Sequence, residues 1–194
     1  MKNAKKVIVL ALCAILLVAA SVMGTLAYLT SQATVQNTFT VGNVSIKLEE
    51  YVVDPQTGVK NANATPVTAM ENLELVPGRE IQKNPFITVN GTESCWLVVK
   101  VTNELGEAIT INGMDDWNKV EVAGKDGYYM YKQTVDAGEK IDVFTSITCK
   151  DTNTSDSLAA LAGKKIVVTA YAIQAENVAA ENVISYLGKH YTLN

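Results

Sequence analysis

The sequence predicts an all-β protein: a jelly-roll-like antiparallel β-sandwich with one or two short helices, preceded by an N-terminal signal helix. About eight short runs rich in β-branched and aromatic residues follow one another, separated by Gly, Asn and Pro turns. The sequence has no long amphipathic helix and no alternation of helices with strands, which argues against an α/β sheet. The first 27 residues are basic and then apolar, unlike the rest of the chain.

Residues 1–27 have the layout of a secretory signal peptide. Three lysines precede an uncharged apolar run from Val7 to Met23. Small side chains at Thr25 and Ala27 fit the positions that a signal peptidase reads, so we expect cleavage between Ala27 and Tyr28. The alternative is an uncleaved anchor, because the run holds 17 residues and a membrane-spanning helix needs about 20. We expect a secreted protein of the extracellular matrix or cell surface, which contacts the membrane only through an uncleaved signal peptide.

The mature chain is expected to contain a flexible leader, residues 28–37, and one domain, residues 38–194. Cleavage removes three of the 16 basic residues and none of the 20 acidic ones, so the net charge changes from −4 to −7. An acidic chain of this kind is a poor partner for nucleic acid or for an anionic membrane surface.

The first strand signal covers Thr38–Glu50. Phe39 and Val41 alternate with polar residues, and the alternation then changes parity at Gly42-Asn43, which predicts a β-bulge. Val44, Ile46 and Leu48 continue the apolar face on the other side of that step. Further strands are expected in these segments: 81–89, 95–101, 109–111, 117–122, 128–132, 141–149 and 164–174.

Several local signals refine these strands. Pro85 predicts that strand 81–89 lies at a sheet edge or is bulged, and Asn90-Gly91 predicts a hairpin turn. In strand 95–101, the odd-numbered residues are expected to be buried and the even-numbered ones half-exposed. Residues 156–162 predict a short helix capped by Thr154 or Ser155. Residues 177–187 predict a second one, ended by Gly188.

Two cysteines, Cys95 and Cys149, remain after loss of the signal peptide. An even number in an exported chain permits a disulfide. Two separate buried thiols are the alternative, because free cysteine is among the most buried residue types.

The sequence predicts no catalytic residues, no cofactor and no metal centre. Its single histidine, His190, lies near the C-terminus, so a zinc motif or a catalytic triad would depend on that one residue. Asp115 and Asp116 are weak candidates for calcium ligands, but they fit a solvated turn better. An aromatic surface of Trp117 and Tyr128–Tyr131 would suit a monomeric surface adhesin that binds a glycan or Ca²⁺. Cross-strand packing explains those aromatic residues equally well.

Two sequence blocks carry a resemblance to a known family. Gly24–Thr30 reads GTLAYLT, and Asn37–Val44 reads NTFTVGNV. Together they resemble the signal end and first strand of the TasA/camelysin group, exported proteins of Gram-positive bacteria that are processed by the signal peptidase SipW. The segments 75–79, 95–101 and 170–175 are also similar to clostridial members, so the resemblance extends over nearly the whole chain.

This resemblance implies a jelly-roll subunit of the biofilm matrix, processed by a signal peptidase of the SipW type and joined by accessory matrix proteins. It implies self-association into fibres, in which the N-terminal strand of one subunit completes a sheet of the next. The donor-strand residues would be Phe39, Val41, Val44, Ile46 and Leu48. The camelysin branch carries a metalloprotease label, but this sequence has no zinc-binding motif, so a non-enzymatic protein is expected.

Overall fold

The computed structural model describes residues 6, 12–17, 43–70, 73–122 and 124–191. The chain divides into two compact units, residues 1–40 and 41–194. In the first unit, residues 12–17 are helical. Within the described part of the chain, no helix is long and apolar enough to cross a membrane. The expected cleavage site at 25–28, the leader, and the strand residues Phe39 and Val41 lie outside the described residues.

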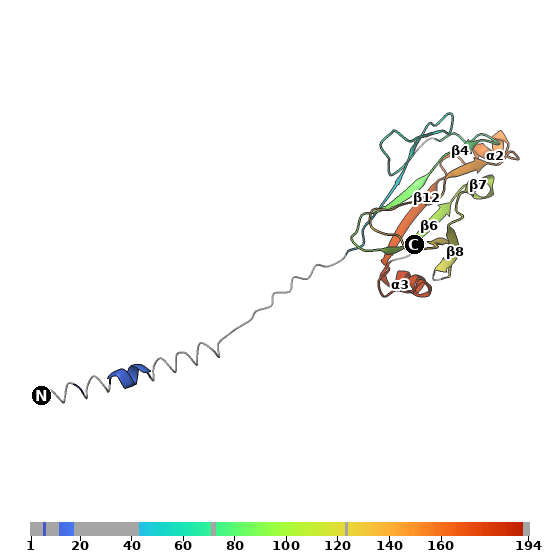
Figure 1. The fold of residues 1–194 in the computed structure, drawn as a ribbon. Coiled ribbons are helices and arrows are strands. Elements are labelled where there is room, and N and C mark those ends of the chain that lie inside the picture. Colours follow the sequence, from blue (N-terminus) through green and yellow to red (C-terminus); the bar gives the residue numbers. More distant parts are fainter. Residues whose placement is uncertain (1–5, 7–11, 18–42, 71–72, 123, 192–194) are drawn as a thin grey trace. The chain divides into compact units, whose positions relative to one another are not determined.

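The second unit is built mostly of antiparallel strands, with few short helices (Figure 1). Its strands are β1 (Ile46–Glu50), β2 (Val52–Val53), β3 (Lys60–Asn61), β4 (Glu80–Ile81), β5 (Pro85–Val89), β6 (Cys95–Asn103), β7 (Ile109–Asn112), β8 (Trp117–Val122), β9 (Lys125–Tyr131), β10 (Lys140–Asp142), β11 (Ser146–Cys149) and β12 (Ile166–Gln174). Its helical elements are η1 (Gly106–Ala108), α2 (Ser155–Ala159), η2 (Ala180–Asn182) and α3 (Val183–His190). This composition confirms the all-β class.

The strands form four hydrogen-bonded groups, and two of these groups lie end to end as one longer sheet. The orders are β12-β6-β9-β8, β1-β5-β10, β4-β11-β7 and β2-β3. Lys140 pairs with Thr88, and Ile147 pairs with Ile81 in the same antiparallel register. Strands β4 and β5 therefore act as one interrupted strand, paired with β10 and β11 as another. The β12-β6-β9-β8 sheet is thus one layer. The combined strands make a second layer, in which β1 is one edge strand and β7 the other.

One hydrophobic core joins these layers. It contains Ile87 and Ile147 from one side and Leu97, Val99 and Val101 from the other, all buried. The arrangement is consistent with an all-β sandwich. All the buried residues of both core clusters lie between Val53 and Leu187, so the second unit contains its own cores.

A second, smaller cluster lies on the outer face of β6. Val98 and Tyr128 pack there against Val183 and Leu187 of α3. The expectation of a half-exposed face at Val98 was therefore wrong, because a helix far along the chain covers it. The predicted alternation did identify Cys95, Leu97, Val99 and Val101 as buried residues.

Other local predictions fail where a strand changes its partner. Asn90-Gly91 does not close a hairpin, because β5 pairs with β1 and β10, whereas β6 pairs with β12 and β9. The edge alternative for Pro85 is wrong, because Pro85 begins β5, the middle strand of its group, where a first position tolerates the missing N–H. The expected strand 81–89 is, however, irregular at this point, because residues 82–84 separate β4 from β5. The segment 141–149 is divided into β10 and β11, with Thr145 exposed between them.

The helix predictions were partly correct. Thr154 caps α2, and its side chain accepts a hydrogen bond from the Ser157 backbone N–H while the Ser157 hydroxyl accepts one in return. Gly188 does not end the last helix, because α3 continues to His190.

Candidate functional site

A hollow among the described residues lies between two edge strands, β1 and β12. It is a cavity of about 710 Å³, which we call the groove. A volume of this size falls in the range of about 300–1,000 Å³ that is typical of binding pockets. Leu48–Glu50 of β1 line one side and Ile166–Val168 of β12 line another. Residues 68–70, 73 and 75 and several residues of the segment 158–165 also line it, together with Lys83, Pro85, Leu105 and Ile147.

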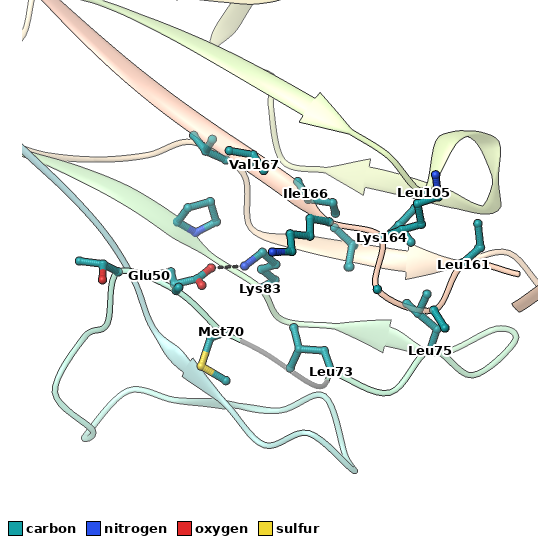
Figure 2. Close-up of a pocket in the computed structure, with 18 of the residues that line it drawn as sticks. Glu50, Met70, Leu73, Leu75, Lys83, Leu105, Leu161, Lys164, Ile166 and Val167 are labelled. Atoms are coloured by element: carbon teal, nitrogen blue, oxygen red, sulfur yellow. Dashed lines mark hydrogen bonds and ion pairs between the residues drawn. The ribbon is translucent and has the colours of Figure 1, made fainter. Parts of the chain in front are cut away.

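The groove is lined chiefly by aliphatic side chains. Figure 2 shows Met70, Leu73 and Leu75 on one side and Ile166 of β12 on the other. Several of the lining residues also pack against the main core, so the groove opens directly onto it: Leu48, Met70, Leu73, Leu75, Leu161 and Ile166. An apolar surface of this kind is stabilised when another apolar group covers it.

A buried ion pair stands in the groove between these two sides (Figure 2). The Lys83 Nζ donates to Glu50 Oε2, and the two side chains are only 11% and 8% exposed. Within this pair, each charge compensates the other. Lys164 and Lys165 line the same cavity next to β12.

The edge of β12 beside the groove is not paired with another described strand. β12 hydrogen-bonds to β6 on one side and ends its sheet on the other. Val167, in the part of β12 that lines the groove, is 45% exposed. At the opposite end of the strand, the Tyr191 hydroxyl donates to the Ala172 carbonyl oxygen at 3.0 Å. The edge next to the groove is thus without a partner strand among the described residues.

The five predicted donor-strand residues do not lie together in one described strand. Ile46 and Leu48 belong to β1, which pairs with β5 of its own chain. Val44 precedes β1 and packs against the main core. Phe39 and Val41 lie outside the described residues.

The two cysteines lie in different sheets. Cys95 is in β6 and Cys149 in β11, and both are buried free thiols. The structure thus has the second of the two arrangements that the sequence permits. Burial raises the pKa of the Cys95 thiol to about 11.

The aromatic binding surface that the sequence offered as an alternative, Trp117 with Tyr128–Tyr131, is not exposed as a whole. Trp117 and Tyr128 are buried, and the Trp117 indole N–H donates to the Asp142 carbonyl oxygen at 3.0 Å. Asp115 and Asp116 lie in an exposed turn before β8. Burial, and then the nearby carboxylates of Asp116 and Glu139, raises the pKa of Tyr131. Among the residues that the structure describes, no three His, Cys, Asp or Glu side chains are grouped to hold a metal.

Sequence reasoning missed the groove and its ion pair. One signal for them was present: Glu50 continues the alternation of Ile46 and Leu48 and therefore occupies an inward position. An inward-facing carboxylate requires a partner, and a nearby lysine is the natural one. The walls of the groove had no such signal, because they come from segments distant in sequence.

Comparison with known proteins adds no relative to this picture. No protein-family model, curated protein or solved structure matches this chain.

Proposed function

We propose that this protein is a secreted, non-enzymatic structural subunit of the extracellular biofilm matrix, of the TasA/camelysin type. It would be released by a signal peptidase of the SipW type and would assemble into fibres by donor-strand exchange. The proposal rests on the family-like signal and first-strand blocks together with the groove between β1 and β12.

The observation that carries the proposal is the edge of β12 beside the apolar groove, which pairs with no other strand that the structure describes. An edge strand offers a row of backbone N–H and C=O groups that an extended segment of another chain can pair with. Main-chain hydrogen bonds would supply affinity, and the apolar groove would receive alternate side chains. The mostly aliphatic lining of the groove favours a segment with apolar side chains.

The chain has such a segment ahead of β1. Residues 28–42 contain no Asp, Glu, Lys, Arg or His. Because Ile46 and Leu48 pair within their own chain, we assign the exchanged part to the residues that precede β1. This narrows the donor strand expected from the sequence to its N-terminal part.

We also propose a jelly-roll architecture for the subunit. Apart from the β2-β3 pair, the strands of the second unit make two four-membered layers when β4 and β5 count as one strand and β10 and β11 as another. Eight strands in two sheets is the composition of a jelly roll, which supports that architecture for the subunit.

Electron microscopy of residues 28–194 beside residues 43–194 tests the function. The longer chain should form fibres and the shorter one should not, because it lacks the donor segment. Added to the longer chain, the shorter one should shorten the fibres, since it offers a groove but no strand. A short chain carrying Ile166→Lys is the control and should leave fibre length unchanged. Monodisperse monomers from residues 28–194 at all concentrations would overturn the proposal.

A further inference from the structure

The groove between β1 and β12 has the lining of a site for an aliphatic chain. Leu73, Leu75 and Ile166 present branched aliphatic side chains to it (Figure 2), and none of the described lining residues is aromatic. A ligand with a flat ring would gain most from stacking on an aromatic side chain. The lining therefore favours a flexible aliphatic chain over a sugar or an aromatic ligand.

The groove also reaches the buried core of the second unit. Leu105 and Ile147 line it, although they are only 8% and 2% exposed. Met70 lies at its wall, and the unbranched side chain of methionine adapts to ligands of irregular shape. An aliphatic tail in the groove would leave water together with this apolar surface, which is the main driving force for binding an apolar group.

Positive charge stands next to this apolar lining. Both carboxylates that line the groove, Glu49 and Glu50, are already held in ion pairs with lysines. Lys164 and Lys165 line the same groove, and they form no ion pair with any residue that the structure describes. An anionic group beside these two lysines would therefore meet charge of the opposite sign that the described residues do not compensate.

Backbone contacts fix the two lysines where the chain enters β12. Gly163, with a φ of 78°, makes the turn that precedes them. The Lys164 N–H donates to the carbonyl oxygen of Leu161, which itself lines the groove, at 3.0 Å. The Lys165 N–H donates to Glu104 Oε2 at 3.0 Å, and the Glu104 N–H donates to the Lys165 carbonyl oxygen at 3.0 Å. The Glu104 carboxylate thus binds a backbone N–H and forms no ion pair with the ammonium groups.

We propose that the groove binds a free single-chain carboxylate of the fatty-acid class. Lys164 and Lys165 would bind the carboxylate, and the aliphatic walls would enclose the tail. The whole chain is acidic, with a net charge of −4, so this local pair of lysines and not the overall charge would attract the anion.

This inference uses the groove but not the donor segment, so it stands independently of the proposed function. If both hold, the carboxylate and the donor strand compete for one groove. A bound fatty acid would then keep the subunits apart.

Isothermal titration of residues 43–194 with decanoate tests the site. This chain lacks the donor segment and contains every buried residue of both cores. Decanoate should bind saturably, more tightly than 1-decanol and much more tightly than decyltrimethylammonium. From octanoate to decanoate to dodecanoate, affinity should rise up to about fourfold for each added methylene that is buried.

A pair of lysine substitutions tests the head-group contact. Lys164→Gln together with Lys165→Gln should weaken decanoate binding about fivefold, because a partly exposed charge contact contributes a factor of about two to five. Binding of 1-decanol should stay within about twofold, which also shows that the variant is folded. The control removes the same charge from the β8–β9 hairpin, by Lys119→Gln with Lys125→Gln, and should leave decanoate binding unchanged.

Three results would overturn the site. These are no saturable binding of decanoate, equal binding of decyltrimethylammonium, and equal effects of the two lysine pairs. Vesicles of a diacyl phosphatidylglycerol should not bind the chain. Binding to those vesicles without binding of free decanoate would replace the proposed ligand by a membrane surface.

Fibre growth of residues 28–194 separates this inference from the proposed function. Decanoate should slow that growth if the donor strand uses the groove. If decanoate binds but growth is unchanged, the ligand site stands and the donor strand does not enter this groove. If fibres form but decanoate does not bind, fibre assembly stands and the ligand site is wrong.

Discussion

The Asn84 side-chain Nδ2 donates to the Phe144 carbonyl oxygen at 3.0 Å, at the point where two paired strands are both interrupted. Asn84 lies between β4 and β5, and Phe144 lies between β10 and β11. The same amide accepts a hydrogen bond from Lys60 Nζ at 3.0 Å. One side chain thus replaces the sheet hydrogen bonds that the interruption removes and also anchors β3.

Asn84→Ala should lower the free energy of unfolding by about 2 kcal/mol. Asn84 is only 1% exposed, so the substitution leaves a buried carbonyl oxygen without its partner, which costs about 1–3 kcal/mol. Urea denaturation measures the change. Asn118→Ala, on an exposed position of β8, is the control and should have an effect within about 0.5 kcal/mol. Equal effects of the two substitutions would contradict the assigned role.

The buried pair of Glu50 and Lys83 predicts a non-additive response. Lys83→Ala should destabilise the unit by about 3–5 kcal/mol, because it leaves a buried carboxylate unpaired. Replacing both residues by leucine should cost much less, because no charge then stays buried. Lys47→Ala removes a lysine whose side chain is 60% exposed and should cost less than about 1 kcal/mol. A double substitution as damaging as the sum of the single ones would refute the pairing.

Tyr128→Phe should stabilise the protein by about 1 kcal/mol. The Tyr128 hydroxyl is buried and has no hydrogen-bond partner among the described residues, so its removal relieves a desolvation penalty. Burial, and then the neighbouring Tyr171, also raises the pKa of Tyr128. The measurement is the urea midpoint. Tyr129→Phe, at the half-buried next position, provides the baseline. A clear loss of stability would show that the hydroxyl has a partner.

Alanine substitutions at Gly113 and Gly138 distinguish the cost of backbone strain from the cost of a steric clash. Both have positive φ, 80° and 89°, so an alanine at either site should cost about 1–2 kcal/mol. Only at Gly113 would the new methyl group also meet Thr145, at 2.9 Å from its Cγ2. Gly113→Ala should therefore lower the melting temperature more than Gly138→Ala. Adding Thr145→Ala to Gly113→Ala should recover part of this difference in melting temperature. If it recovers none, the clash with Thr145 is not the cause.

Cys95 predicts a loss of stability in alkaline solution. Burial raises the pKa of its thiol from 9.0 to about 11, so the unfolded chain ionises there first. Between these values the folded state binds more protons, and stability falls as the pH rises. The contribution is fully present below pH 9.0 and is lost as the pH approaches about 11.

Cys95→Ala tests this linkage by removing the titration. The difference in unfolding free energy between the original chain and the variant should narrow as the pH rises from about 9 to about 11. Val99→Ala alters a buried residue of the same strand that does not ionise, so its difference should stay constant. A constant difference for both variants would contradict the raised pKa.

The sequence located most strands but not their partners. Alternation in the segment 95–101 identified the core face because burial on a strand has a period of two residues. Asn90-Gly91 was misinterpreted as a hairpin turn because a glycine needed for a close backbone approach to Asn43 has the same local sequence as one needed for a turn. No local pattern could place α3 over Val98 or close the groove, since these contacts join residues far apart in the chain.

The β6–β12 pair sets the order in which this polypeptide can acquire its structure. Cys95 pairs with Gln174, and the nine-residue ladder ends at Asn103 with Ile166. A chain that emerges N-terminus first exposes β6 long before its partner is available, and α3, which buries the other face of β6, comes later still. Pairing across so many residues has an entropic cost of loop closure and slows folding. We therefore expect the sandwich to form only after the last quarter of the chain is free, and not progressively during its emergence.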